Sequence, residues 1–322
     1  MTESWFDLRG GLLRVNAEAE LLAPLLIYLE PLRCSPGPAC FELSIDWGVP
    51  EEAPAGMTLA FRGELPEGGT AALWLASGRR RLDVEGRLSA EVDERAGQTR
   101  MRVAPGCERW IRASAGMLCL DAALRAAGQI LAHAAAVIPP GRAEAILLCG
   151  PSGRGKTTTT LALALGGFAA LTDDASILGG ADEALRVWGL PRPMKLHRNS
   201  LALLPVLRAV TGSTWNEDDE QGLQVDALRS LIDVRGPEPV PLAGVVWLGE
   251  RSAGPHLLRP AGRADLLAWL AADNVQRAPQ GVAEDSIARF NALARAVAAC
   301  RVYELQVGTD LSSLAETLAR AL

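Results

Sequence analysis

The chain has 322 residues, 49% of them hydrophobic, which is enough to form a sizeable core in one large domain or two smaller ones. Its formal net charge is −6 and no stretch is densely basic, so the sequence predicts no nucleic-acid partner. The N-terminus has no apolar signal region, and charged residues interrupt the most apolar stretch, near 113–138, so we expect a cytoplasmic protein that does not enter the membrane.

The sequence pattern of residues 1–108 predicts a β-rich domain. Short runs of alternating polar and apolar residues, such as CFELSIDW and QTRMRVAPG, are separated by turns rich in glycine, proline and glutamate. This pattern predicts an antiparallel meander with one face in water. The stretch contains no obvious catalytic constellation, so we assign it a possible role in docking a substrate or partner.

Residues 109–322 are expected to form a second domain of the α/β class. A long helix is predicted to lead into it from CERWIRAS, and PPGRAE at 139–144 is a turn that joins two strands. Further on, the apolar strand LAGVVWLGE is followed by helical stretches at 263–273 and 283–299. Because strands and helices alternate from about residue 130 onward, the sequence indicates the α/β class.

A glycine-rich stretch, GPSGRGKT at 150–157, follows an apolar strand and precedes a predicted helix. It fits G-x-x-x-x-G-K-[ST], in which main-chain amides and a helix N-terminus cradle phosphates. We expect Lys156 to neutralise the phosphates and the Thr157 hydroxyl to bind Mg²⁺. For Ser152, contact with a phosphate and simple filling of the turn both remain open. The predicted nucleotide-binding residues are Ser152, Gly153, Arg154, Gly155, Lys156, Thr157 and Thr158.

Two adjacent carboxylates, Asp173 and Asp174, end the next apolar strand. A carboxylate at a strand end beside a phosphate-binding loop commonly holds Mg²⁺, so Asp173 is predicted to be a metal ligand together with Thr157. On an extended chain the two side chains point apart, whereas a turn places both in the site. Their like charges would then separate their pKa values and leave one as a proton acceptor. The alternative is a pair that only caps a turn.

Lysine is rare in this chain. Of the 32 lysines and arginines only two, Lys156 and Lys195, are lysines. Where arginine is the ordinary cation, a lysine indicates a need for a compact ammonium group, so Lys195 is predicted to be catalytic. An accident of codon usage is the alternative.

His133 lies among alanines on the strand before the glycine-rich stretch. A histidine in such surroundings is often a core residue with a satisfied hydrogen bond. The small neighbours, however, leave room for a ligand or a carboxylate beside the ring, so His133 is also a candidate catalytic residue.

The order of these features resembles the HPr kinase/phosphorylase group, bacterial serine kinases with a P-loop in a fold related to phosphoenolpyruvate carboxykinase. The resemblance is carried by His133, GPSGRGKT, a helix that ends in glycine, and TDD. It implies a fold of that kind, with ATP and Mg²⁺ as cofactors. In that family the second aspartate is the general base toward the acceptor serine, which implies this role for Asp174, helped by His133. The matching positions are His133, Gly155, Lys156, Thr157, Asp173 and Asp174.

Two further stretches, PRPMKL and VYELQVGTDLSSLAETL, look more like the HPr-kinase-related enzymes of peptide-tailoring clusters, including the lasso-peptide kinases. The chain lacks the Glu-Ile-Arg-Gly-Leu-Gly-like stretch of true HPr kinases, which argues against the bifunctional enzyme and against HPr as its substrate. Arg192, Lys195 and Arg198 occupy that region. We expect them to clamp a phosphate or a substrate carboxylate, although both arginines could be ordinary surface cations.

The leading hypothesis is therefore an ATP-dependent kinase that phosphorylates serine in a peptide or small protein, such as a ribosomally made precursor. A nucleotide-binding docking partner without phosphotransfer is the alternative from a different class. A small-molecule kinase is less favoured, because it would need a basic lid and the loop TWNEDDEQG at 214–222 is acidic. Oligomerisation is possible, and the sequence does not decide it.

Overall fold

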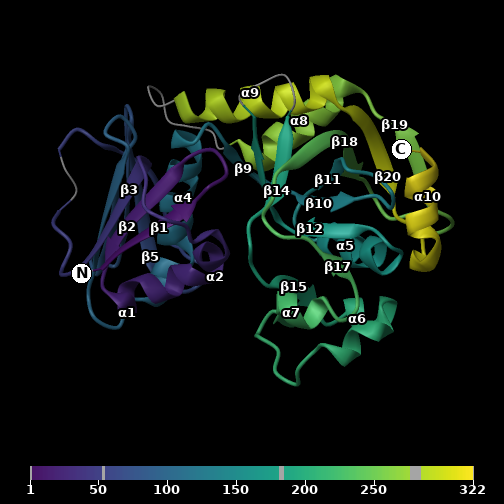
Figure 1. The fold of residues 1–322 in the computed structure, drawn as a ribbon, viewed down its shortest axis with the longest axis horizontal. Helices are drawn as coiled ribbons and strands as arrows, with labels where there is room; N and C mark the ends of the chain where they lie inside the picture. Colours follow the sequence, from purple (N-terminus) through teal and green to yellow (C-terminus); the bar gives the residue numbers. More distant parts are fainter. Residues whose placement is uncertain (1, 53–54, 181–184, 276–283, 322) are drawn as a thin grey trace. The chain divides into compact units, whose positions relative to one another are not determined.

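The computed structural model describes residues 2–52, 55–180, 185–275 and 284–321, and its architecture is mixed α/β (Figure 1). The chain divides into two compact units, and each is described by itself. The described residues of the first unit fall within Met1–Ile130 and Gln276–Arg289, and those of the second within Leu131–Val275 and Phe290–Leu322. No helix in these described ranges is long and apolar enough to cross a membrane.

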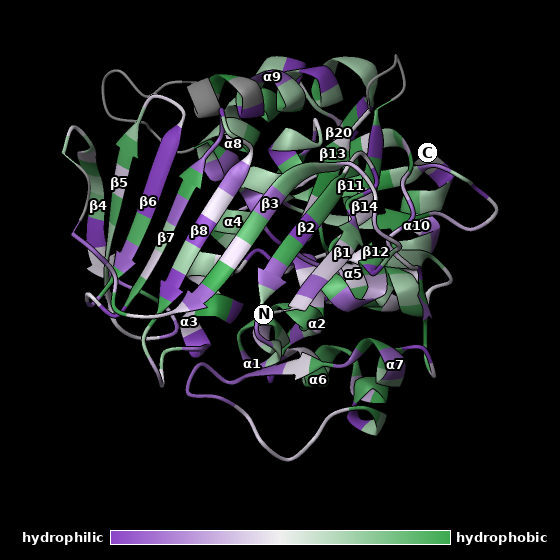
Figure 2. Ribbon diagram, turned by 60° about the vertical axis from the view of Figure 1, so that its left-hand side comes forward, coloured by the Kyte–Doolittle hydropathy of each residue, from purple (hydrophilic) through white to green (hydrophobic). Residues whose placement is uncertain are grey.

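The first unit contains one sheet of eight strands in the order β1-β2-β3-β8-β7-β6-β5-β4 (Figure 2). The strands are β1 (Thr2–Asp7), β2 (Leu12–Ala17), β3 (Ala39–Trp47), β4 (Thr58–Glu64), β5 (Thr70–Ala76), β6 (Arg79–Val84), β7 (Leu88–Asp93) and β8 (Gln98–Val103). The helices are α1 (Ala19–Leu22), α2 (Leu26–Leu29), α3 (Arg109–Arg112) and α4 (Ser114–Ala126), with 3₁₀ turns η1 (Ala23–Leu25) and η2 (Glu30–Leu32).

The predicted antiparallel meander is confirmed for β4 to β8 and is wrong for β3, which runs parallel to both β2 and β8. Parallel neighbours need a crossover connection, and the short helical turns between residues 19 and 32 supply it. The sequence pattern suggested no strand for residues 2–7, which pair with β2.

The long helix expected to lead into the second domain is instead α3 and α4, and both belong to the first unit. Helix α4 packs against β3 and β7, which covers one face of the sheet. It ends at Ala126, and Gly128 follows at φ 72°, a left-handed conformation that commonly terminates helices. The division between the units therefore falls at residue 130, whereas the sequence pattern suggested 108.

From residue 130 onward, strands and helices alternate as predicted. The strands are β9 (Ile130–His133), β10 (Ala135–Ile138), β11 (Ala145–Cys149), β12 (Ala169–Thr172), β13 (Ala175–Gly179), β14 (Arg186–Gly189), β15 (Met194–His197), β16 (Glu220–Leu223), β17 (Asp233–Val234), β18 (Val240–Leu248), β19 (Leu257–Pro260) and β20 (Arg301–Gln306). The helices are α5 (Lys156–Leu165), α6 (Ser200–Leu203), α7 (Val225–Leu228), α8 (Arg263–Asn274), α9 (Glu284–Ala299) and α10 (Leu314–Ala321), with 3₁₀ turns η3 (Pro205–Ala209) and η4 (Leu311–Ser313).

The strand directions in the second sheet bring the ends of several strands to one edge of the sheet. Strand β10 is antiparallel to both neighbours, β11 and β12, so these two strands run in the same direction and end at the same edge. Strand β18 is parallel to β11 and ends there too. The amino end of β10, just after His133, lies at this edge as well, because Ala135 pairs with Leu148 and Ala136 with Thr172.

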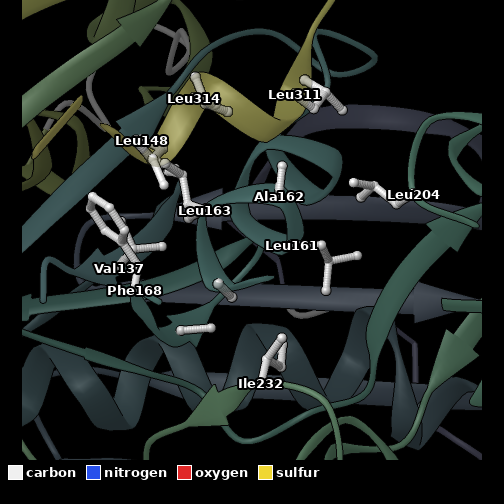
Figure 3. Close-up of a cluster of buried hydrophobic side chains, with 14 of the residues drawn as sticks. Val137, Leu148, Leu161, Ala162, Leu163, Phe168, Leu204, Ile232, Leu311 and Leu314 are labelled. Carbon is white, nitrogen blue, oxygen red and sulfur yellow. The ribbon is translucent and has the colours of Figure 1, made fainter. Parts of the chain in front are cut away.

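Helix α5 lies over this sheet and anchors its core. Figure 3 shows Leu161 and Leu163 of α5 among the buried side chains, with Val137 and Leu148 from the sheet. All four are almost completely shielded from water, at 0% relative exposure. Burial of each such side chain stabilises the fold by roughly 1.5–3 kcal/mol, which fixes the start of α5 relative to the strand ends.

We predict that Gly189→Ala destabilises the protein by about 1–3 kcal/mol, because overpacking in a close-packed interior forces the backbone to move. A Cβ atom at Gly189 would lie 2.2 Å from the Leu171 carbonyl oxygen and 2.8 Å from Thr172 Cβ, just before Asp173. The free energy of unfolding in urea measures this. Gly236→Ala is the matched control, since nothing lies within 4 Å of its Cβ position. Equal stability of the two variants would contradict the prediction.

Candidate active site

The glycine-rich stretch forms a loop between β11 and α5, as the sequence predicted. Gly153 and Gly155 adopt φ values of 79° and 89°, in the left-handed region that side chains disfavour. A Cβ atom at either position would meet nothing within 4 Å, so backbone conformation, not crowding, requires glycine here. Gly155 is the N-cap of α5, whose first main-chain amides therefore face the loop. Such a helix N-terminus is a suitable anion-binding site.

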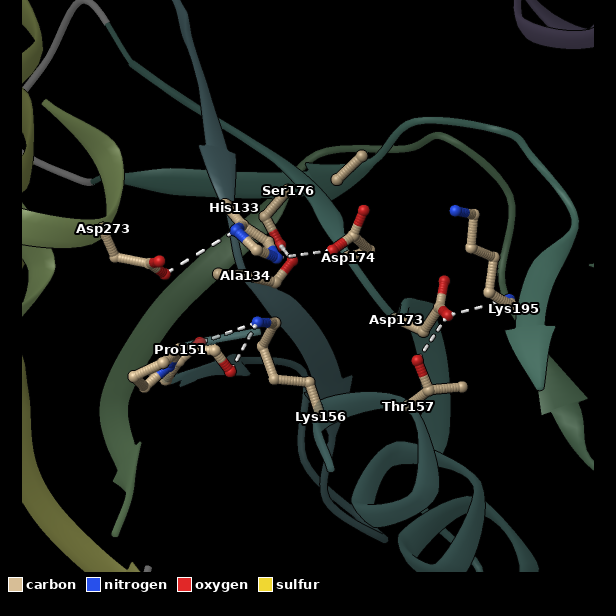
Figure 4. Close-up of polar contacts among 12 residues, drawn as sticks. His133, Ala134, Pro151, Lys156, Thr157, Asp173, Asp174, Ser176, Lys195 and Asp273 are labelled. Carbon is tan, nitrogen blue, oxygen red and sulfur yellow. Dashed lines mark hydrogen bonds and ion pairs between the residues drawn. The ribbon is translucent and has the colours of Figure 1, made fainter. Parts of the chain in front are cut away.

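Lys156, the first residue of α5, is 7% exposed and points back into the loop. Its Nζ atom donates to the carbonyl oxygen of Gly150 at 2.7 Å, and the carbonyl of Pro151 lies at 3.5 Å (Figure 4). Burial lowers the pKa of this ammonium group, and the nearby charge of Asp273 opposes that effect. Both hydrogen bonds that the ammonium makes in the described part of the chain go to carbonyl oxygens, so this buried cation is ready to pair with an anion that enters the loop.

Thr157 and Asp173 meet beside the loop. The Thr157 hydroxyl donates to Asp173 Oδ2 at 2.8 Å, and the main-chain NH of Lys195 donates to the same oxygen at 3.2 Å (Figure 4). Asp173 is 1% exposed, and burial raises its pKa. Its other oxygen, Oδ1, is buried and has no hydrogen-bond partner among the described residues.

These oxygens fit Mg²⁺. A hydroxyl and a carboxylate are the hard donors that this ion prefers, and it usually keeps several waters and phosphate oxygens as its other ligands. A buried Oδ1 without a partner is the kind of atom that a cation satisfies. No group of three or more His, Cys, Asp or Glu side chains is placed to hold a metal in the described part of the chain, so a cage made by the protein alone is not present there.

Asp174 faces a different set of partners from those of Asp173. His133 Nε2 lies 2.8 Å from its Oδ1, and Arg192 forms a close ion pair with its Oδ2. Burial alone would raise the pKa of Asp174, but the hydrogen bond from His133 and the charge of Arg192 outweigh it and hold the pKa below the ordinary value of 3.8. The two neighbouring aspartates therefore have pKa values shifted in opposite directions. The sequence analysis expected like-charge repulsion to separate them, whereas burial of Asp173 and the contacts of Asp174 with His133 and Arg192 are the larger causes.

Arg192 lies between Pro191 and Pro193 in the segment that joins β14 to β15. Its side chain is 17% exposed, and its Nε atom is buried with no hydrogen-bond partner in the described parts of the chain. The sequence analysis left its role open among the cations of this region. Its contact with Asp174 places it in the site.

All the sequence-predicted site residues line one pocket of about 870 Å³. They come from the strand ends and the loop described above: His133, Ser152, Gly153, Arg154, Gly155, Lys156, Thr157, Thr158, Asp173, Asp174 and Lys195. The pocket lies at the carboxyl ends of parallel strands, where α/β sheets commonly bind ligands. The segment between β12 and β13 places both aspartates in the pocket, the arrangement expected if the strand ended in a turn.

Lys195 lines the pocket with its amine directed toward Glu220, 3.5 Å from Oε2, and its side chain is 65% exposed. A surface ion pair of this kind contributes little to stability. Arg198 is outside the lining and pairs with Asp219 at 3.0 Å, with its guanidinium over the Trp215 ring.

Sequence reasoning missed several members of the site. Arg251 follows β18 and lines the pocket, as do His197, Asn199 and Glu220. Asp273 lies behind His133, with Oδ2 3.7 Å from Nδ1. Asp273 is 140 residues from His133 along the chain and ends an ordinary helix, so no local pattern could have revealed it.

Comparison with known proteins adds little to this geometry. No family model matches the chain, and no curated protein matches it. Among solved structures, the HPr(Ser) kinase/phosphatase from Coxiella burnetii is similar at 16% sequence identity, with 59% of this chain and 94% of that chain covered and a TM-score of 0.32. A likeness at this score does not establish a shared fold family.

We predict that Asp173→Asn stabilises the protein without nucleotide, because the amide removes a buried negative charge. Since the folded-state pKa of Asp173 is raised, its contribution to stability is lost as pH rises from its ordinary value of 3.8 through the folded value. The variant should therefore show a higher urea midpoint than the wild type at pH 7, with the difference shrinking toward pH 3. A lower midpoint at pH 7 would contradict the prediction.

Proposed function

We propose that this protein is an ATP-dependent kinase that transfers a phosphoryl group to a serine hydroxyl of a peptide or small protein. One observation carries the proposal: a glycine-rich loop, a buried lysine, a Thr–Asp pair and a second, ionised aspartate all line one pocket. Each part suits a different requirement of phosphoryl transfer, in which alignment and electrostatics supply most of the catalysis.

In this proposal, different pocket residues bind the nucleotide, hold the metal and accept the proton. The loop amides and Lys156 bind the triphosphate, and Thr157 with Asp173 would hold Mg²⁺. Bound Mg²⁺ would offset charge on the phosphates. Asp174 accepts the proton of the serine hydroxyl as the serine oxygen bonds to the γ-phosphorus and the bond to the bridging oxygen breaks, releasing ADP. Arg192 and Lys195 line the pocket and would offset charge on the transferred group.

Two features of the pocket rim support a peptide or protein acceptor. Leu203 lines the pocket and is 39% exposed, and Val206, three residues further along the chain, is 47% exposed, so large apolar side chains are exposed near the site. A small polar metabolite would not need that surface, whereas a peptide side chain would cover it. The acidic residues at 217–220, the last of which lines the pocket, suit a basic neighbour of the serine.

A second candidate function is a nucleotide-binding partner that transfers no phosphate. It is favoured by the contacts of Asp174, because His133 and Arg192 engage both of its oxygens and hold its pKa low, which weakens it as a proton acceptor. In that case the pocket would bind a nucleotide as a conformational ligand only.

The decisive experiment is mass spectrometry of serine-containing peptides after incubation with the protein, ATP and Mg²⁺. Precursor peptides encoded beside this chain are the first to test, together with versions in which each serine is replaced by alanine. A mass increase of one phosphate group, lost with one particular alanine replacement, supports the kinase. Tight ATP binding without transfer to any peptide or consumption of ATP supports the docking partner.

We predict that Asp174→Asn slows phosphoryl transfer by about 10²–10⁴-fold, the usual contribution of a general base. Its affinity for ATP should change little, because Asp174 lies outside the phosphate loop. Single-turnover transfer and calorimetric ATP binding measure the two effects. Asp226→Asn serves as the control, since its carboxylate is 92% exposed and outside the pocket. Transfer at the wild-type rate by Asp174→Asn would remove the base assignment.

Lys156→Ala should weaken ATP binding by about 10–100-fold, since a hydrogen bond to a charged group is worth roughly 1.5–3 kcal/mol. Isothermal titration calorimetry with ATP and Mg²⁺ measures the dissociation constant. Arg229→Ala also removes one positive charge, but from an exposed ion pair with Asp226, so it should bind ATP as the wild type does. Unchanged affinity in Lys156→Ala would exclude contact between this ammonium and the phosphates.

A further inference from the structure

The last turn of α8 holds His133 by both its main chain and its ring. Asn274 Oδ1 accepts the main-chain NH of His133 at 2.6 Å, and Asn274 Nδ2 in turn donates to Leu270 O at 3.1 Å. Asp273 Oδ2 lies 3.7 Å from Nδ1 of the ring (Figure 4). Two consecutive residues at the end of one helix therefore face one histidine at the edge of the site.

The imidazole lies between two carboxylates. Its Nε2 is 2.8 Å from Asp174 Oδ1, and its Nδ1 faces Asp273 (Figure 4). A separation of 2.8 Å between Nε2 and Oδ1 is a hydrogen-bond distance and requires a proton between the two atoms, because two bare acceptors that close would repel each other. A ring rotation that exchanged the two nitrogens with carbon atoms would lose both contacts, so the pair of carboxylates selects one ring orientation.

Asp273 itself is removed from the substrate. It does not line the pocket, whereas His133 and Asp174 do. Its Oδ2 atom is buried and has no hydrogen-bond partner among the described residues, and Nδ1 of the imidazole lies 3.7 Å from it. A carboxylate in this place can affect a reaction in the pocket only through its neighbours.

We propose that Asp273 is a positioning residue, which holds the His133 ring so that Nε2 stays on Asp174 and fixes the orientation of that carboxylate. The orientation of the ring follows from the contacts alone, while its consequence for phosphoryl transfer rests on the proposed function. Carboxylates behind a functional histidine commonly orient the ring, and their loss costs about 10–100-fold in activity.

The first test reads the ring directly. The chain has three histidines, so ¹⁵N-labelling of histidine gives few imidazole signals, and His133→Gln identifies those of His133 by their loss. Asp273→Asn should shift the His133 ring-nitrogen signals, and the other two histidines should be unaffected. Asp265→Asn, the same change at an exposed position of α8, should leave all three unchanged. Unchanged His133 signals in Asp273→Asn would overturn the proposal.

The second test is a double-mutant cycle on transfer rate. Asp273→Asn should lower kcat by about 10–100-fold with KM for ATP within about threefold, and it should cause no further loss in a His133→Gln background. A wild-type kcat in Asp273→Asn, or an equal loss in the His133→Gln background, would show that Asp273 does not act through His133. If Asp273→Asn does not fold, Asp273→Ser replaces it in both tests.

The two tests separate the inference from the proposed function. If the wild-type protein transfers no phosphate, the kinase proposal fails and the nuclear magnetic resonance result still decides whether Asp273 orients the ring. If transfer occurs and the His133 signals do not respond to Asp273→Asn, the kinase proposal stands and the positioning role is rejected.

Discussion

The site depends on the direction of a single strand. Because β10 runs antiparallel to both β11 and β12, the loop after β11, the aspartates after β12 and the histidine before β10 arrive at one edge of the sheet. Each of these three features directly precedes or follows a strand, so the hydrogen-bonded sheet fixes its position. Almost completely buried side chains of α5 and the sheet hold that arrangement, so the precision of the polar site derives from apolar packing.

Electrostatics then differentiates residues that are chemically alike. Asp173 and Asp174 are consecutive, yet burial raises the pKa of one while His133 and Arg192 lower that of the other. Burial likewise disfavours the charged form of Lys156 and lowers its pKa. The folded chain thus keeps a destabilised anion and a destabilised cation within one pocket. Arrangements of this kind are typical of sites that are stabilised when their ligands bind.

The sequence was informative where the candidate site residues belong to short contiguous motifs. The loop, the start of α5, the paired aspartates and His133 are all short local patterns, and all of them lie at one pocket as the sequence suggested, while their roles stay predictions. What depended on distant contacts could not be inferred: Asp273 reaches His133 only through the packing of α8, and the parallel course of β3 depends on helical turns that show no periodicity. The division between units was also hidden, since α4 has an apolar face that would suit either sheet.

The proline on each side of Arg192 has a consequence for how this side chain can respond to a ligand. Pro191 has a fixed φ angle, and Pro193 confines the residue before it to extended conformations, so the main chain here has few alternatives. Any exchange of Arg192 between Asp174 and an incoming anion is therefore restricted to rotations of its own side-chain bonds. Such rotations need no rearrangement of the main chain, so the packing around this largely buried side chain, and not loop motion, governs the exchange of partners.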